Sequence, residues 1–190
     1  MYEEMPRIIA GKAKGLKLKS LKGEQTRPSG DRLKEALFSI IQARLVGSDF
    51  LDVFAGSGQM GLEALSRGAK SACLIEKNRQ AAEVLAANIA LSRLEGAELL
   101  RGDAVKELKG LIRQERRFDL VYLDPPWGQA ENLLKQIQPL LSALARPDAL
   151  AIVELDQSQA GLSDLFALPM VKTCHYGRAM LLFYNVNDGV

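Results

Sequence analysis

The chain has 190 residues, of which 47% are hydrophobic and 25% are charged. This length suffices for one domain with a substantial core, and the composition excludes disordered, fibrous and membrane-spanning proteins. Residues 1–6 have neither the basic start nor the apolar stretch of a signal peptide, so we expect a cytoplasmic protein. The two cysteines, Cys73 and Cys174, are expected to be buried thiols in a reducing compartment.

The net charge of +2 is unevenly distributed. Residues 7–34 hold nine basic and two acidic residues, a net charge of +7, so the rest of the chain sums to −5. Such asymmetry indicates that the N-terminal segment contacts a polyanion. Within it, residues 7–19 alternate lysines with small or apolar residues, which predicts a short hairpin or pair of strands. The lysines could instead only protect an exposed sheet edge, which is their commoner role.

After the turn-like residues 26–30, Asp31 can cap an amphipathic helix whose apolar residues recur at helical spacing from Leu33 to Ile41. From residue 50 onward, strand-like and helical segments alternate, which predicts a parallel sheet with helices on both faces. The predicted strands are 50–54, 72–76, 97–101, 118–124 and 149–154, and the helices lie near 60–67, 78–92, 104–115 and 129–145.

The last two strand-like segments, 171–176 and 179–184, are too close together for a crossover helix and must form an antiparallel hairpin. A mostly parallel sheet that ends in such a hairpin is the pattern of the Rossmann-like class I methyltransferase fold, an α/β fold. Dinucleotide dehydrogenases usually remain parallel throughout. We therefore expect a basic N-terminal β extension over residues 1–30, which would contact a polyanion, and a domain of this fold over residues 31–190.

A glycine-rich loop follows the first predicted strand, with glycines at positions 56, 58 and 61 that let a ligand approach the backbone. Glu76 ends the next strand, where an acid can bind the ribose of an adenosine. This suits NAD or S-adenosylmethionine, but Asp52 beside the loop would repel a pyrophosphate and favours the sulfonium cofactor. Asp103 could reach the adenine amine or only cap a helix. The predicted cofactor residues are Asp52, Phe54, Ala55, Gly56, Ser57, Gly58, Gly61, Glu76, Lys77, Asp103 and Ala104.

The segment Asp124-Pro125-Pro126-Trp127 follows a buried strand at the sheet edge where open α/β folds bind ligands. Its prolines make a rigid turn that presents mainly hydrogen-bond acceptors. The Asp124 carboxylate and the Pro125 carbonyl could each accept one N–H of an aryl amine and aim its nitrogen at a methyl donor. Trp127 would stack on the base, or else plug the end of the sheet. We predict that these four residues are catalytic.

These motifs resemble the RsmD family, the bacterial small-subunit ribosomal RNA guanine-N2 methyltransferases. The resemblance covers nearly the whole chain, and its departures are Trp127 in place of Phe or Tyr and Gln59-Met60 in the glycine-rich loop. It implies a guanine of 16S rRNA in an assembled or nearly assembled small subunit as substrate, with the basic residues contacting RNA. The motifs are Arg7-Ile-Ile-Ala-Gly-Lys12, Thr26-Arg-Pro-Ser-Gly-Asp-Arg32, Leu37-Phe38, Asp52-Val-Phe-Ala-Gly-Ser-Gly58, Gly61-Leu-Glu-Ala-Leu-Ser-Arg67, Glu76, Asn88, Asp124-Pro-Pro126 and Tyr176-Gly177. The predicted RNA-binding residues are Arg7, Lys12, Lys14, Lys17, Lys19, Arg27 and Arg32.

Other functions fit the sequence less well. An adenine-N6 methyltransferase acting on RNA or DNA would use the same turn, but DNA-modifying members usually carry a target-recognition region that 190 residues leave no room for. A catalytically idle RNA-binding protein would not need Glu76, Asp124 and the glycine loop, and a nicotinamide dehydrogenase would not have the terminal hairpin. Hydrolase and metal-dependent chemistry lack a nucleophile elbow and clustered metal ligands. We expect a monomer that does not bind membranes.

Overall fold

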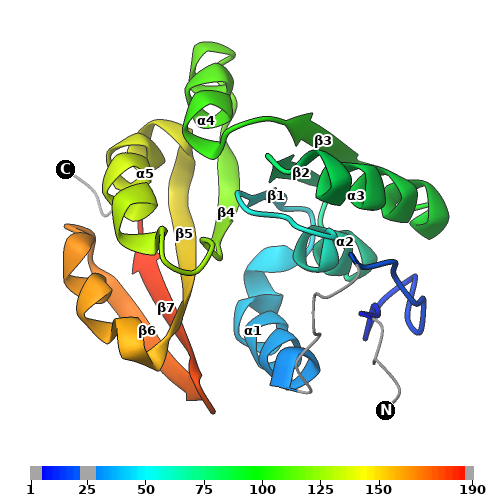
Figure 1. Ribbon diagram of the computed structural model, residues 1–190, viewed down its shortest axis with the longest axis horizontal. Coiled ribbons are helices and arrows are strands. Elements are labelled where there is room, and N and C mark those ends of the chain that lie inside the picture. The colour runs from blue at the N-terminus through cyan, green and yellow to red at the C-terminus, as the bar shows by residue number, and fades with distance from the viewer. Residues whose placement is uncertain (1–5, 22–28, 187–190) are drawn as a thin grey trace.

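The computed structural model describes residues 6–21 and 29–186, and its centre is a seven-stranded sheet (Figure 1). The strands are β1 (Asp49–Asp52), β2 (Ser71–Glu76), β3 (Ala97–Arg101), β4 (Phe118–Leu123), β5 (Ala145–Asp156), β6 (Met170–Tyr176) and β7 (Ala179–Asn185). They lie in the order β3-β2-β1-β4-β5-β7-β6. Strands β1 to β5 pair in parallel, whereas β7 is antiparallel to both β5 and β6. The predicted parallel sheet with a C-terminal antiparallel hairpin is confirmed.

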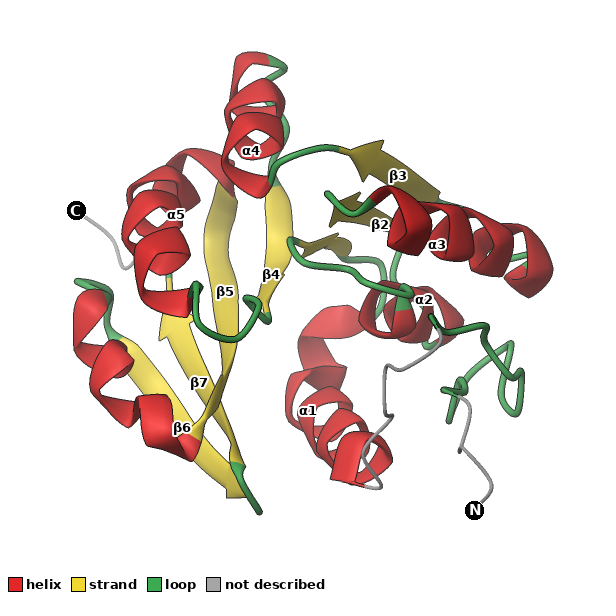
Figure 2. Ribbon diagram, viewed as in Figure 1, coloured by secondary structure: helices red, strands yellow, loops and turns green. Residues whose placement is uncertain are grey.

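Helices cover both faces of the sheet, as the alternating pattern predicted (Figures 1 and 2). They are α1 (Ser29–Leu45), α2 (Gln59–Ser66), α3 (Arg79–Ser92), α4 (Ala104–Arg113), α5 (Ala130–Leu144) and the 3-10 helix η1 (Gln157–Leu165). One hydrophobic core joins α4 and α5 to the sheet, and a second joins α1, α2 and α3 to the opposite face. None of the helices within the described ranges is long and apolar enough to cross a bilayer.

Two elements differ from their predictions. Helix α1 begins at Ser29, so Asp31 lies in its first turn rather than at the cap, and its carboxylate pairs with Arg7 at 2.8 Å. Strand β5 begins at Ala145, where a helix end was expected. The pairing of β5 with β4 shifts register just after Ala145, and Asp148 has a φ of +63° there. This irregularity explains why residues 146–148 look like a turn in the sequence.

The described part of the N-terminal segment, residues 6–21, folds back on itself without forming regular strands. Its one isolated bridge pairs Arg7 with Lys17, and the Ile8 amide donates to the Leu16 carbonyl at 2.9 Å. Ile8 and Leu18 are fully buried in the core that includes α1 and α2. The segment is therefore packed against the rest of the chain, and its assignment as a separate RNA-contacting unit, residues 1–30, stays a prediction.

Candidate active site

The loops that follow β1 and β4 emerge at one edge of the sheet, because these strands pair in parallel with Asp52 beside Tyr122 (Figure 2). The first is the glycine-rich loop, and the second contains the Asp124-Pro125-Pro126-Trp127 turn. Open α/β folds bind their ligands at this carboxyl-terminal edge of the strands. The fold thus brings together two motifs that lie about 70 residues apart in the sequence.

The glycine-rich loop has a shape that larger residues could not adopt. Gly58 has a φ of +86°, and a Cβ atom there would lie 2.3 Å from a Leu85 methyl carbon. Gly56 also has a positive φ, of +52°, but a Cβ atom at that position would meet nothing within 4 Å. The backbone at Gly56 consequently faces open space through which a ligand can approach.

Glu76 lies at the end of β2 with its carboxylate against the glycine-rich loop. One oxygen accepts the Gly56 amide at 2.9 Å, and the other accepts the Asn78 amide at 2.6 Å. Each carboxylate oxygen can accept more than one hydrogen bond. These contacts therefore orient Glu76 and leave it able to accept hydrogen bonds from a ligand. This placement suits the predicted contact with ribose hydroxyls, which stays a prediction.

Asp52 is buried below the same loop, and the hydrogen-bonding capacity of its carboxylate is only partly used. Its Oδ2 atom accepts the Gly61 amide at 3.2 Å, whereas Oδ1 has no hydrogen-bond partner among the residues that the structure describes. Burial raises the pKa of Asp52 to about 7, with a smaller contribution from the nearby Glu76 charge. A ligand with a positive charge or an N–H donor would offset this cost.

Asp103 caps helix α4, as one of its two proposed roles required. Its carboxylate accepts the Lys106 amide at 3.4 Å and pairs with Lys77 at 3.0 Å, and this hydrogen bond with Lys77 is the main reason that the pKa of Asp103 is lowered. Ala104, the first residue of α4, is buried. The contact of Asp103 with an adenine amine stays a prediction.

The Asp124-Pro125-Pro126-Trp127 turn, predicted to be catalytic, presents a carboxylate and an aromatic ring to solvent. Asp124 is exposed, Pro125 is buried, and the Gln129 amide donates to the Pro126 carbonyl at 3.1 Å, which closes the turn. The Trp127 side chain is 71% exposed. It therefore does not plug the end of the sheet, and its face is accessible to a base.

Tyr122 and Glu154 belong to this site but were not predicted from the sequence. Tyr122 is buried on β4, and its hydroxyl donates to the Glu154 carboxylate on β5. Burial raises the pKa of Tyr122 well above 10, and the Glu154, Asp124 and Asp52 charges raise it further. The phenol thus contacts one acidic side chain, Glu154, and feels the charges of two others. Recognising this cluster requires the strand order, which places β5 beside β4.

A second cluster missed in the sequence joins the N-terminal segment to the domain. The buried Glu63 carboxylate accepts the amides of Ile9 and Ala10 at 2.8 and 3.0 Å, and it pairs with Arg67 at 2.7 Å. Lys34, also buried, lies 3.9 Å from Glu63, and burial lowers its pKa against the opposing effect of that charge. Glu63 is therefore the main polar anchor of the segment.

Asn88 links the N-terminal segment directly to the glycine-rich loop. This buried side chain on α3 accepts the Lys19 amide at 2.8 Å and donates to the Lys19 carbonyl at 2.9 Å. It also donates to the Ser57 carbonyl at 2.8 Å. One side chain therefore holds both segments in place.

The predicted RNA-binding residues of the N-terminal segment extend from the end of α2, near Lys12, to the glycine-rich loop, near Lys19. The Lys12 amide donates to the carbonyl of Ser66, which ends α2, and Gly47, just before β1, donates to Gly68. The turn of the N-terminal segment thus lies near the edge where the strands begin. Arg27 lies outside the described residues, and the others are exposed, namely Arg7, Lys12, Lys14, Lys17, Lys19 and Arg32.

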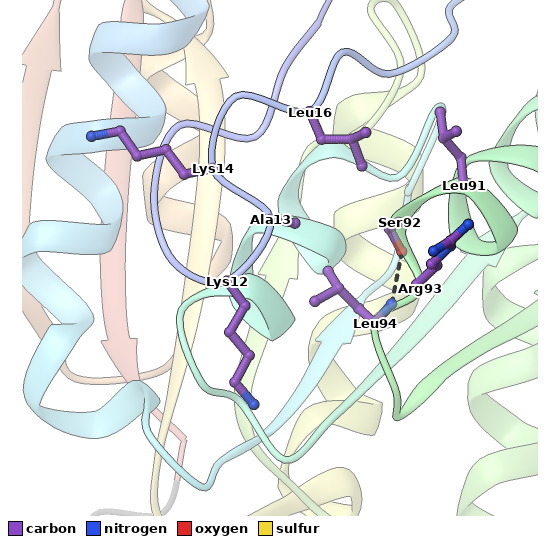
Figure 3. A pocket seen from close by; sticks show the side chains of 8 residues that line it. All are labelled: Lys12, Ala13, Lys14, Leu16, Leu91, Ser92, Arg93 and Leu94. Carbon is purple, nitrogen blue, oxygen red and sulfur yellow. Dashed lines mark hydrogen bonds between the residues drawn. The ribbon is translucent and has the colours of Figure 1, made fainter.

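A pocket of about 420 Å³ lies between this turn and the end of α3 (Figure 3). Leucines at positions 16, 91 and 94 contribute its apolar lining, and Lys12, Lys14 and Arg93 contribute its cations. In Figure 3, Lys12 and Lys14 extend in different directions rather than converging on one point. The arrangement suits several contacts along an extended anion better than one compact ligand.

The family model described as Conserved hypothetical protein 95 matches residues 6–185 of this chain. The chain belongs to this family. It is the RsmD family, so the membership expected from the sequence motifs is confirmed. Ribosomal RNA small subunit methyltransferase D of Haemophilus influenzae is 40% identical over 80% of each chain. The putative rRNA methyltransferase YlbH of Bacillus subtilis is 32% identical over 94% of this chain and 98% of that protein.

Solved structures agree with membership of the RsmD family. The structure described as putative methyltransferase yhhF from Escherichia coli has a TM-score of 0.78 and 30% identity, and the match covers 94% of this chain and 96% of that one. The predicted Rossmann-like methyltransferase fold is thereby confirmed. In this member of the RsmD family, the candidate functional residues lie in the loops that follow β1 and β4 and in the N-terminal segment.

Proposed function

We propose that this chain is a methyltransferase that transfers a methyl group from S-adenosylmethionine to the exocyclic N2 amine of a guanine in 16S rRNA of the small ribosomal subunit. The observation that carries the proposal is the exposed Asp124-Pro125-Pro126-Trp127 turn beside the glycine-rich loop at one sheet edge. The relatives named as ribosomal RNA methyltransferases support the same activity. Such a substrate also implies a cytoplasmic location.

The residues around the glycine-rich loop fit S-adenosylmethionine. The open space at Gly56 admits a ligand against the backbone, and Glu76 is oriented to accept hydroxyl donors. The unsatisfied Oδ1 atom of Asp52 suits the positive charge of this cofactor, whereas it would repel a pyrophosphate. The cofactor supplies an electrophilic methyl group on its sulfonium.

The catalytic turn orients the amine that receives the methyl group. The lone pair of an aryl amine is delocalised into the base, so methylation is slow unless the nitrogen is held along the axis of the sulfonium bond. The Asp124 carboxylate and the Pro125 carbonyl can accept its two N–H bonds. Positive charge builds up on the nitrogen during transfer, and both acceptors stabilise it because they are already in place.

Trp127 supplies a surface for the base. Stacking on an aromatic side chain contributes about 1–3 kcal/mol per base. Extruding a base from a helix or stacked loop costs a few kcal/mol, which stacking alone does not exceed. The basic residues of the N-terminal segment would therefore supply additional affinity for the RNA.

The direct test is to incubate the purified protein with labelled S-adenosylmethionine and either small subunits or naked 16S rRNA. The methylated nucleoside is then identified by mass spectrometry and its position mapped. N2-methylguanosine is the expected product. N6-methyladenosine would replace this proposal with the adenine alternative, and an absence of methylation on both substrates would leave the chain as an RNA-binding protein.

A further inference from the structure

Glu154 lies beside the catalytic turn although it comes 30 residues later in the sequence. Strands β4 and β5 pair in parallel with Leu123 next to Val153, so Asp124, the first residue after β4, follows beside Glu154. Glu154 itself remains within β5, where it pairs with Leu181 of β7. Side chains alternate between faces along a strand, and Tyr122 lies beside Ile152. Tyr122 and Glu154 consequently share a face, where the hydroxyl of one reaches the carboxylate of the other.

The Tyr122 hydroxyl gives this carboxylate a fixed position. Tyr122 is 2% exposed, and its pKa lies far above the ordinary value, so the phenol remains a hydrogen-bond donor at neutral pH. The bond occupies the Oε2 atom of Glu154. Glu154 itself is only half-buried, so part of it stays accessible to a ligand while the Tyr122 hydroxyl restrains its orientation.

The Watson–Crick edges of the two candidate bases differ beside the amine. In guanine, the ring nitrogen N1 next to the amine carries a hydrogen and donates. In adenine, the N1 next to the amine carries a lone pair and accepts. Enzymes that act on an extruded base read this edge through hydrogen bonds. A carboxylate beside Asp124 therefore attracts guanine and repels adenine.

We propose that Glu154, positioned by Tyr122, accepts the N1–H of the target guanine and thereby selects guanine over adenine. This inference rests on the proposed function, because it requires a base whose amine is held by Asp124. Nothing in the glycine-rich loop or in the Asp124-Pro125-Pro126-Trp127 turn makes this distinction, since both serve either amine. Glu154 is thus a specificity residue, and Tyr122 is its positioning residue.

The test compares guanine with 2-aminopurine, which keeps the amine at C2 but has a lone pair at N1. Small subunits are reconstituted with either base at the position mapped by mass spectrometry. We expect the wild-type protein to have a kcat/KM at least about tenfold lower on 2-aminopurine, because a hydrogen bond to a charged acceptor is lost. Equal rates on the two bases would overturn the proposal without affecting the proposed function.

The variants Glu154→Gln and Tyr122→Phe show whether these side chains cause the preference. A glutamine amide can donate to the N1 lone pair, so Glu154→Gln is expected to reduce the guanine preference about tenfold, and Tyr122→Phe to reduce it less. The matched control is Glu83→Gln, an exposed acid on α3 that should leave the preference unchanged.

The outcomes separate the two proposals. If both variants keep the wild-type preference, Glu154 does not read the base and the inference is wrong, even though N2-methylguanosine is formed. If no methylated guanine is found with any protein, the proposed function itself fails. The comparison of guanine with 2-aminopurine uses the wild-type protein. It can therefore refute the inference even when a variant does not fold.

Discussion

A substitution of Asp124 should slow methyl transfer without weakening the binding of the cofactor. In Asp124→Ala the amine loses its charged acceptor, and we expect kcat to fall at least about 100-fold, as for other preorganised groups at a reacting centre. The affinity for S-adenosylmethionine, measured by calorimetry, should change little because Glu76 and the glycine-rich loop are untouched. Asp124→Asn, which keeps one acceptor, should be intermediate. Unchanged turnover in Asp124→Ala would contradict the assignment.

Glu76 should show the opposite behaviour. Glu76→Ala removes the acceptor for the ribose hydroxyls and also that of the Gly56 amide, so we expect the Kd for S-adenosylmethionine to rise about 10- to 100-fold. At saturating cofactor, kcat should remain close to that of the wild type. Glu83→Ala, an exposed acid on the following helix, is the control. An unaltered Kd in Glu76→Ala would show that Glu76 does not bind the ribose hydroxyls.

Asp52 makes stability depend on pH in a direction that is unusual for an acid. Its native pKa of about 7 lies above the ordinary value of 3.8, so the native state binds the proton more tightly than the unfolded chain does. The free energy of unfolding therefore falls as pH rises from about 4 to about 7, by roughly 4 kcal/mol for this group, and then levels off.

The cofactor-free Asp52→Asn variant lacks this titration. We expect its Tm relative to wild type to be higher at pH 8 than at pH 5, measured by calorimetry at both values. Asp31→Asn is the comparison, since that carboxyl is partly exposed and paired with Arg7. A difference between Asp52→Asn and wild type that is the same at both pH values would show that burial does not shift the pKa of Asp52.

At the scale of elements, Glu63 holds the N-terminal segment on the domain. Glu63→Ala leaves the two amides of Ile9 and Ala10 without their acceptor and removes one of the two carboxylates near the buried Lys34, so we expect the free energy of unfolding to fall by about 3–5 kcal/mol. Hydrogen exchange should accelerate most at these two amides. Glu83→Ala should cost less than about 0.5 kcal/mol. Unchanged exchange at Ile9 and Ala10 would mean that apolar packing alone holds the segment.

The alternation of strands and helices could be predicted because each element carries its own pattern in the sequence. Residues 97–101 were predicted with the observed bounds, and the other strands of the parallel region were located by their apolar segments. The start of β5 was missed because residues 146–148 join the sheet through a register shift rather than through a periodic pattern. Asp31 was misplaced because its partner, Arg7, is 24 residues away.

The same distinction holds for the candidate site. The glycine-rich loop and the Asp124-Pro125-Pro126-Trp127 turn are contiguous motifs, so their position at one sheet edge followed from the fold class. Glu63 and Asn88 act on backbone groups 54 and 69 residues away, and no local pattern reports such contacts. Glu154 could have been found only with the strand order in hand.

At the scale of the whole molecule, Lys12 lies near the edge where the strands begin, whereas the Asp124-Pro125-Pro126-Trp127 turn follows the carboxyl end of β4. An RNA that contacts both must therefore extend along the side of the protein, and a short oligonucleotide could not reach both. We expect methylation to be much slower on a short hairpin than on the small subunit, measured as kcat/KM. Equal rates would show that the N-terminal lysines do not take part in substrate capture.

The salt dependence of RNA binding tests those lysines directly. Replacing Lys12, Lys14, Lys17 and Lys19 with glutamine removes up to four phosphate contacts, which should reduce the slope of log K against log salt by up to about three. The control removes four exposed lysines from other faces, namely Lys106, Lys109, Lys135 and Lys172. If both sets change the slope equally, the N-terminal lysines only protect the chain from aggregation.

We expect Asn88 to couple the binding of RNA to the binding of S-adenosylmethionine. Because it holds Lys19 and Ser57 at once, whatever rigidifies the N-terminal segment also restrains the glycine-rich loop. Linkage makes such an effect reciprocal, so RNA should raise the affinity for S-adenosylmethionine by the same factor by which the cofactor raises the affinity for RNA. The Kd for S-adenosylmethionine should therefore be lower in the presence of RNA than in its absence, and Asn88→Ala should remove the difference.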